Sequence, residues 1–122
     1  MAKVAVRYIV NDVDQALAFY RDRLGFELEF HPAPGFASLS RGELRLLLNA
    51  PGTGGAGVAG DAVPEPGGWN RFQIEVSDLQ KLVKELRAAG ASFRGEIAHG
   101  KGGDQVLVAD PSGNVVELFE SF

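Results

Sequence analysis

Charged and amide side chains stand on several stretches whose residues otherwise alternate like half-buried strands. The polar residues on these faces are Arg7, Arg71, Gln73, Glu75 and Glu117. A buried charge is costly unless it is paired, so the arginines are expected to meet the glutamates, water or a ligand. Such residues serve either as internal ion pairs or as orienting groups in a small-molecule pocket. General base catalysis by Glu117 or Glu75 is a third use, and it requires burial to raise the pKa of the carboxyl.

The rest of these faces is apolar. The full set expected on the concave side of the sheets is Ala5, Arg7, Ile9, Leu44, Leu46, Leu48, Arg71, Gln73, Glu75, Val115, Glu117 and Phe119. Phe36 follows a Pro-Gly break and Trp69 ends a Gly- and Pro-rich segment, so each is a candidate to stack on a planar ligand. For Trp69, packing against the strand that follows is the alternative.

Outside these strand faces, the sequence gives little support for a catalytic nucleophile or for a metal site. The chain has no cysteine, and its two histidines, His31 and His99, are expected at strand ends in solvated roles. Neither has an identifiable nucleophile partner in the sequence, so no Ser-His-Asp arrangement is predicted. The segment HGKGGDQ lacks phosphate-loop spacing and precedes a strand, which favours a flexible hairpin loop.

A strand-and-helix unit that occurs twice must position these side chains. Residues 5–17 (AVRYIVNDVDQAL) align with residues 71–83 (RFQIEVSDLQKLV), with Asp12 opposite Asp78. Each aspartate is a predicted helix N-cap, and glycines 25 and 90 are predicted left-handed stops. The expected buried stripes are Val13, Leu17, Tyr20 and Leu24, and then Leu79, Leu82, Val83 and Leu86.

Strands are predicted before and after each helix. Their ranges are 3–10, 26–31, 36–40 and 43–49 in the first half, and 71–76, 92–98, 105–109 and 114–120 in the second. Phe26, Phe30, Phe72 and Phe93 are expected in the core, and Pro32 is expected to end its strand. The fold class is therefore α+β, with a strand, a helix and three strands in each half.

Length and composition suit one structural domain made of two modules. The predicted boundaries are 1–50 for the first module, 51–68 for a linker and 69–122 for the second module. The linker, PGTGGAGVAGDAVPEPGG, is expected to hold no regular element or core, and is either a solvated connector or a mobile flap. The net charge of −4 favours neither a nucleic-acid nor a membrane partner. Without a targeting or membrane-spanning pattern, a cytoplasmic location is predicted.

Three segments carry a resemblance to a known family: IVNDVDQALAFYRDRLGFEL, FQIEVSDLQKLVKELRAAGASF and VADPSGNVVELFE. They resemble the superfamily of glyoxalase I, bleomycin resistance protein and extradiol dioxygenase, also called vicinal oxygen chelate. The resemblance implies paired βαβββ modules that curl into a partly open mixed β-barrel with the helices outside, often in a homodimer. It does not by itself imply a reaction.

Enzymes of this family typically hold a divalent metal with His or Glu at four positions. Carried over by the resemblance, these positions fall on Ala5, Leu46, Arg71 and Glu117. Only Glu117 can bind a cation, whereas a divalent metal needs three or four donors. We therefore predict no metal at this site and no other cofactor.

The leading hypothesis is a non-catalytic protein that sequesters an apolar or aromatic antibiotic or natural product, closest in character to the metal-free bleomycin-resistance-like proteins. Ligand orientation is assigned to Arg7, Arg71, Gln73, Glu75 and Glu117, and contact area to Phe36, Leu46, Trp69 and Phe119. The alternatives are a metal-independent enzyme with a Glu general base and, ranked last, a metal-dependent enzyme of the glyoxalase or dioxygenase type. The ligand's identity is not set by the sequence.

Overall fold

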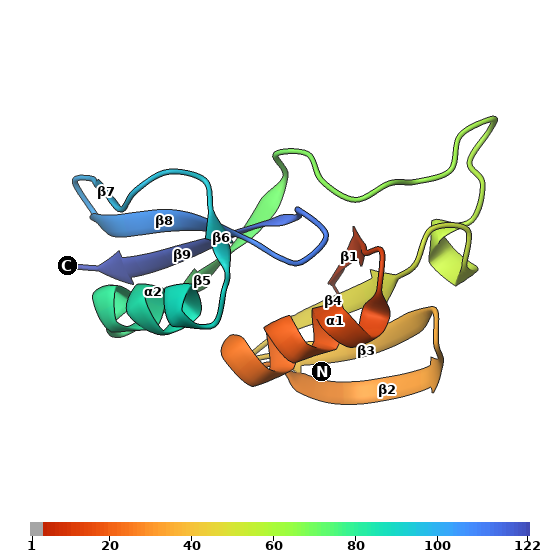
Figure 1. Ribbon diagram of the computed structural model, residues 1–122, viewed down its shortest axis with the longest axis horizontal. Coiled ribbons are helices and arrows are strands. Elements are labelled where there is room, and N and C mark those ends of the chain that lie inside the picture. The colour runs from red at the N-terminus through yellow and green to blue at the C-terminus, as the bar shows by residue number, and fades with distance from the viewer. Residues whose placement is uncertain (1–3) are drawn as a thin grey trace. The chain divides into compact units, whose positions relative to one another are not determined.

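The computed structural model describes residues 4–122 and has an α+β fold with two sheets. The first compact unit ends at Gly67, and the second comprises Gly68–Phe122. We call them the N-terminal unit and the C-terminal unit. Their elements are β1 (Ala5–Ile9), α1 (Val13–Leu17), a π-helical turn (Ala18–Arg23), β2 (Glu27–Ala33), β3 (Phe36–Arg41), β4 (Leu44–Asn49) and a 3-10 turn (Gly54–Ala56), then β5 (Arg71–Glu75), α2 (Leu79–Ala88), β6 (Ser92–Phe93), β7 (Ala98–His99), β8 (Gly103–Ala109) and β9 (Val115–Ser121). In Figure 1 each helix lies against the sheet of its own unit.

The predicted duplication is confirmed by strand pairing. The N-terminal sheet has the order β1-β4-β3-β2, and the C-terminal sheet has the order β5-β9-β8-β6, with β7 also paired to β8. In each unit the first strand pairs in parallel with the last one, β1 with β4 and β5 with β9. Each unit is therefore a βαβββ module. The predicted start of the first strand at Lys3 lies outside the described residues. The curling of the two sheets into one partly open barrel stays a prediction.

The predicted N-cap of the first helix is confirmed, because Asp12 Oδ1 accepts a hydrogen bond from the Gln15 amide at 3.1 Å. The helix continues beyond α1 as a π-helical turn that the sequence did not predict. This wider turn buries both Phe19 and Tyr20, whose rings meet edge to face with centroids 5.0 Å apart. All four residues of the predicted stripe are buried. Gly25 follows with a φ of +75°, which fits a left-handed stop.

The second helix is capped by two carboxylates. Asp78 Oδ1 accepts from the Lys81 amide at 3.1 Å, as predicted, and Glu120 Oε1 accepts from the Leu79 amide at 2.8 Å. Of the predicted stripe, Leu79, Val83 and Leu86 are buried and Leu82 is half-buried. Gly90 ends the helix with a φ of +88°. The carboxylate from β9 therefore fixes the start of α2 to its own sheet.

The prediction for the strand after the first helix was partly wrong. β2 runs past Pro32 to Ala33. Phe30, which was expected in the core, is 59% exposed, and Leu28 on the same strand is 37% exposed. Register shifts between Leu28 and Phe30 and between Phe30 and Ala33 interrupt the alternation. β2 is an edge strand, where a proline need not donate a ladder hydrogen bond.

Two further expectations need correction. The predicted strand over 92–98 is divided into β6 and β7, because Gly95 between them adopts a φ of +93°. Phe72 and Phe93 are half-buried instead of fully buried. The linker also holds a 3-10 turn whose Ala56 is fully buried, so the expectation that this segment has no regular element was wrong.

Candidate functional site

The polar face of the C-terminal unit is built by β5 and β9. Their parallel register places Gln73 beside Glu117. Glu117 Oε1 accepts from Arg71 Nε at 3.0 Å, and its Oε2 accepts from Gln73 Nε2 at 2.5 Å. Of the partners expected for Arg71, which were a glutamate, water or a ligand, the structure shows a glutamate, and both oxygens of its carboxylate are engaged. The ion pair is partly shielded, with side chains 32% and 12% exposed.

The protonation behaviour of Glu117 follows from these contacts. The hydrogen bond from Gln73 lowers the pKa of Glu117, and the hydrogen bond and charge of Arg71 lower it further, while burial acts in the opposite direction. The net shift is downward from 4.5. The raised pKa that the general-base alternative requires of Glu117 is therefore not found, because the contacts with Gln73 and Arg71 outweigh the effect of burial. A carboxylate with a lowered pKa is a weaker base. Its two hydrogen bonds also hold it in one orientation as an acceptor.

Glu75 and Phe119 extend the same face toward the end of the sheet, where they are register partners. Glu75 is exposed and Phe119 is half-buried. Glu75 also borders an open depression of about 380 Å³, which is lined by Glu75, Val76, Ser77, Glu120 and Ser121. The five polar and aromatic positions predicted on β5 and β9 thus lie on one face: Arg71, Gln73, Glu75, Glu117 and Phe119.

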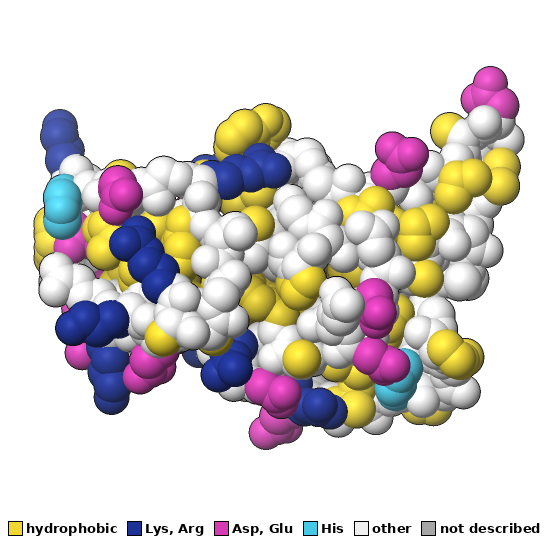
Figure 2. All heavy atoms as spheres, viewed as in Figure 1, with side chains coloured by type: hydrophobic (Ala, Val, Ile, Leu, Met, Phe, Trp, Pro, Cys, Tyr) yellow, Lys and Arg dark blue, Asp and Glu magenta, His cyan; other side chains and the backbone are white. Residues whose placement is uncertain are grey.

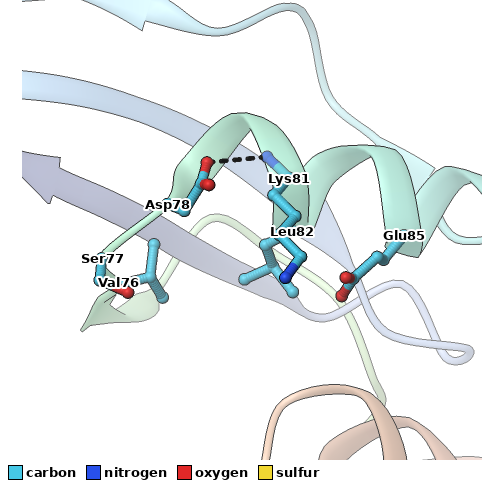
Figure 3. Close-up of a pocket in the computed structure, with 6 residues that line it drawn as sticks. All are labelled: Val76, Ser77, Asp78, Lys81, Leu82 and Glu85. Carbon is cyan, nitrogen blue, oxygen red and sulfur yellow. Dashed lines mark hydrogen bonds between the residues drawn. The ribbon is translucent and has the colours of Figure 1, made fainter.

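A neighbouring depression of about 430 Å³ was not predicted from the sequence. It is lined by Val76, Ser77, Asp78, Lys81, Leu82 and Glu85, where β5 leads into α2 (Figure 3). The amides of Leu79 and Lys81 at this helix end already donate to Glu120 and Asp78. The backbone amides at this helix N-terminus are therefore already hydrogen-bonded by carboxylates of the same unit.

The N-terminal unit holds Arg7 differently. Arg7 Nε donates to Asn49 Oδ1 at 2.9 Å, and the fully buried Asn49 donates from Nδ2 to the Thr53 carbonyl at 3.2 Å. The guanidinium also lies against Gly55, where a Cβ atom would come within 2.2 Å of Arg7 Cζ. Arg7 meets an amide instead of a glutamate. Asn49, which no sequence pattern marked as a site residue, is the residue that orients it.

Leu46 was placed on the wrong face. Parallel pairing sets Arg7 beside Leu47, and it sets Leu46 beside Val6. Leu46 is fully buried and pairs on its other side with the fully buried Leu39, so it belongs to the core. Leu44 and Leu48 share this error, and the residues of β4 on the Arg7 face are Arg45, Leu47 and Asn49.

Phe36 lies on the Arg7 face, because it is the β3 register partner of Asn49, and it is half-buried. Its carbonyl accepts a hydrogen bond from His31 Nδ1 at 2.7 Å. His31 Nε2 lies 3.5 Å from Asp14 Oδ1, so this histidine connects β2 to α1. The other histidine, His99, is paired through Nδ1 with Asp104 Oδ1 at 2.7 Å, so neither histidine is merely solvated.

Trp69 is 67% exposed at the start of the C-terminal unit. The guanidinium of Arg94 lies over its ring, with Cζ 4.4 Å from the centroid. Arg94 also donates to the carbonyls of Gly68 and Gly113 at 3.3 and 3.4 Å. One face of the indole is therefore covered by a cation.

The four positions expected to hold a metal do not provide its ligands. The strand registers make Leu47, instead of Leu46, the counterpart of Glu117. Leu47 and Ala5 have no donor atom, and Arg71 carries a permanent positive charge. Both oxygens of Glu117 already accept hydrogen bonds. This donor set does not fit a divalent ion.

The described residues on the face shown in Figure 2 form no patch of a single charge sign that would suit a polyanionic partner. Figure 2 shows basic and acidic side chains mixed over the face in view. Among residues 4–122, no helix combines the length and apolar character needed to cross a membrane.

Comparison with known proteins places these features in a family. The model of the Glyoxalase/Bleomycin resistance protein/Dioxygenase superfamily matches residues 4–118. A protein of Haemophilus influenzae named lactoylglutathione lyase is 28% identical over 121 residues, covering 92% of this chain and 87% of the relative.

Solved structures agree at the level of the fold. A member of the same superfamily from Sphaerobacter thermophilus is 26% identical, with a TM-score of 0.79 over 99% of this chain and 98% of that one. The bleomycin-binding protein of Streptomyces verticillus, solved with copper(II)-bleomycin, is 23% identical, with a TM-score of 0.64 over 100% of this chain and 98% of that one.

Proposed function

The chain belongs to the glyoxalase/bleomycin resistance protein/dioxygenase superfamily, and on that premise we propose that it binds and sequesters a small molecule without catalysis. The proposed ligand is an apolar or aromatic antibiotic or natural product. The bleomycin-binding protein of Streptomyces verticillus, which shares the fold, is a precedent for this kind of function.

The proposal rests on the residues found at the positions where enzymes of this family typically hold a metal. Arg71 stands at one of them and forms an ion pair with Glu117, which stands at another. Gln73 engages the second oxygen of Glu117. A face built in this way offers fixed donors and acceptors for recognition, and it does not offer an open Lewis-acid site.

The proposed contacts are those predicted from the sequence, with one replacement. On the N-terminal unit, Arg7 orients a ligand, and Phe36 and Leu47 supply contact area. On the C-terminal unit, Arg71, Gln73, Glu75 and Glu117 orient a ligand, and Trp69 and Phe119 supply contact area. Leu47 takes the place of Leu46, because Leu46 is buried in the core.

Tryptophan fluorescence provides the test, because Trp69 is the only tryptophan in the chain. Titration with bleomycin and other planar antibiotics is expected to give a saturable change for at least one compound, confirmed by calorimetry. Gln73→Ala is expected to weaken that binding, whereas Glu96→Gln, at an exposed carboxylate outside the face, leaves it unchanged. No saturable binding by either method for any compound overturns the proposal.

The relative named lactoylglutathione lyase is the basis for a second candidate, a metal-dependent enzyme of that type, which would need metal ligands other than those at the four positions above. Elemental analysis of protein purified without chelators, together with a lactoylglutathione lyase assay, separates the two. Stoichiometric metal and activity that a chelator removes would favour the enzyme. Sub-stoichiometric metal and no activity favour the binding protein.

We propose a homodimer whose contact includes β2, because Leu28 and Phe30 are exposed on this edge strand. Sedimentation velocity is expected to give a dimer for the natural chain and a monomer for Phe30→Lys. Val58→Lys is the matched control at another exposed apolar residue, and it should remain dimeric. A monomeric natural chain would contradict this assignment.

The remaining assignments stay proposals. They are the module boundaries 1–50 and 69–122, a linker over 51–68, and a cytoplasmic location. Limited proteolysis tests the boundaries, with first cleavage expected inside 51–68, and cell fractionation tests the location.

A further inference from the structure

Arg7 is held in one orientation before any ligand arrives. Its Nε is bonded to Asn49 Oδ1, and Asn49 is itself fully buried and anchored on the Thr53 carbonyl. Gly55 packs against the guanidinium, so the 3-10 turn at Gly54–Ala56 limits its movement. A preorganised guanidinium loses less conformational freedom when it binds a ligand than a free one does.

The charge of Arg7 has no internal counter-ion. Within residues 4–122, neither Arg7 nor Arg45 forms an ion pair, and the only side-chain partner of Arg7 is the neutral Asn49. Arg71 on the C-terminal unit, by contrast, is neutralised by Glu117. Arg7 is therefore an oriented cation of the N-terminal unit whose charge remains available to an anion.

The surroundings of Arg7 are apolar on the same face. In register across the sheet, Arg7 lies beside Leu47, and Leu47 lies beside Ser38. The adjacent row on this face is Ile9, Asn49 and Phe36. Leu47, Ile9 and Phe36 are each half-buried and so present apolar surface beside the guanidinium. This combination suits a flat apolar body that ends in an anionic group.

We propose that the ligand of this protein is an aromatic acid, whose carboxylate, sulfonate or phosphate group is bound by Arg7 while its ring packs on Phe36, Leu47 and Ile9. The proposal rests on the small-molecule binding function above and names the chemical class of its ligand. Asn49 and Gly55 act as positioning residues for the guanidinium.

Two fluorescent probes that differ in one anionic group provide the test. Anilinonaphthalene sulfonate carries a sulfonate on an aromatic body, and N-phenyl-1-naphthylamine has the same rings without it. The natural chain is expected to bind the sulfonate about tenfold more tightly or better, since a charge-assisted hydrogen bond contributes at that level. Arg7→Gln should remove this preference without weakening the neutral probe, and Arg7→Lys should retain part of it.

A second variant keeps every charge and moves only the guanidinium. In Gly55→Ala the new Cβ would come within 2.2 Å of Arg7 Cζ, whereas in Gly57→Ala the nearest contact is an ordinary 3.4 Å to the Gly54 carbonyl. Gly55→Ala is expected to weaken sulfonate binding severalfold, and Gly57→Ala is expected to leave it unchanged. Comparing Gly55→Ala with Gly57→Ala tests the role of Arg7 in sulfonate binding even if Arg7→Gln fails to fold.

The possible failures are distinguishable. Equal binding of both probes by the natural chain, or sulfonate binding that survives both Arg7→Gln and Gly55→Ala, overturns the assignment of Arg7 while binding itself stands. Failure of both probes and of every antibiotic in the calorimetric titration overturns the proposed function and this inference with it.

Discussion

Arg71 and Glu117 lie 46 positions apart in the sequence, yet Arg71 Nε donates to Glu117 Oε1 at 3.0 Å between neighbouring parallel strands. Gln73 occupies the second oxygen, so the carboxylate is held from two sides. The Glu117 contacts explain why its pKa lies below its ordinary value and why it suits recognition better than proton abstraction.

Glu117→Gln is expected to reduce stability in a pH-dependent way. Because the folded-state pKa is lowered, the carboxylate contributes stability fully above its ordinary value of 4.5, and this contribution is lost as the pH falls through the folded-state pKa. At pH 7 the expected cost is about 1–2 kcal/mol. Urea unfolding at neutral and acidic pH measures it, with Glu96→Gln as the control. A cost that does not shrink on acidification would contradict the contacts assigned to Glu117.

Leu46→Ala and Leu47→Ala are expected to act on different properties. Leu46 is fully buried, so its truncation should cost about 2–5 kcal/mol of unfolding free energy. Leu47 is half-buried on the Arg7 face, so its truncation should cost less than half as much and weaken probe binding instead. Equal losses of stability in urea titrations would mean that the register of β4 is misassigned.

Gly103→Ala is expected to destabilise the C-terminal unit. A Cβ at Gly103 would lie 2.1 Å from the Glu120 carbonyl oxygen, and backbone atoms cannot yield as a flexible side chain can. The expected cost is about 3 kcal/mol, at the upper end for overpacking. Gly102→Ala is the matched control, since a Cβ there meets no atom within 4 Å. Thermal unfolding compares the two, and similar midpoints would refute the close approach.

Arg94→Gln is expected to change the emission of Trp69 in the absence of ligand. The guanidinium lies 4.4 Å from the ring centroid, and its removal exposes the covered face of the indole to solvent. The stability cost should be about 0.5–1 kcal/mol, as for other exposed cation–π pairs. Arg87→Gln, which removes a cation from Phe93 instead, should leave the emission spectrum unchanged. Identical spectra for Arg94→Gln and the natural chain would show that this stacking does not persist in solution.

Features encoded by neighbouring residues could be predicted from the sequence. Asp12 and Asp78 cap helices as expected, and Gly25 and Gly90 end them with positive φ. These signals depend on a few adjacent residues, and the repeat made each of them visible twice.

Features that depend on register or on distant contacts could not be predicted in this way. Leu46 was taken as the counterpart of Glu117, but the β3–β4 turn is shorter than the β8–β9 turn, so the true counterpart lies one residue later, at Leu47. A slip of one residue moves a strand side chain to the other face. The exposure of Phe30 depends on bulges against β3, which no periodicity in β2 reveals.

The contacts that orient the candidate site residues were also hidden. Asn49 reaches Arg7 across 42 positions, and nothing in its local sequence marks it as the partner. Arg94 has its ring partner 25 residues earlier, with β5, α2 and β6 between them. The sequence showed which side chains are charged or polar. Only the tertiary structure shows which of these charges are paired with an opposite charge.

The hydrogen bond from the Leu79 amide to Glu120 also has a kinetic consequence. The first turn of α2 takes its second cap from a strand residue 41 positions later, so the helix is not completely capped until β9 has paired with β5. Closing so long a loop costs entropy before its contacts form. During synthesis, the ribosome therefore makes residues 79–88 well before the carboxylate that completes their cap. We expect the C-terminal unit to acquire its native helix and its parallel strand pair in one late, cooperative step.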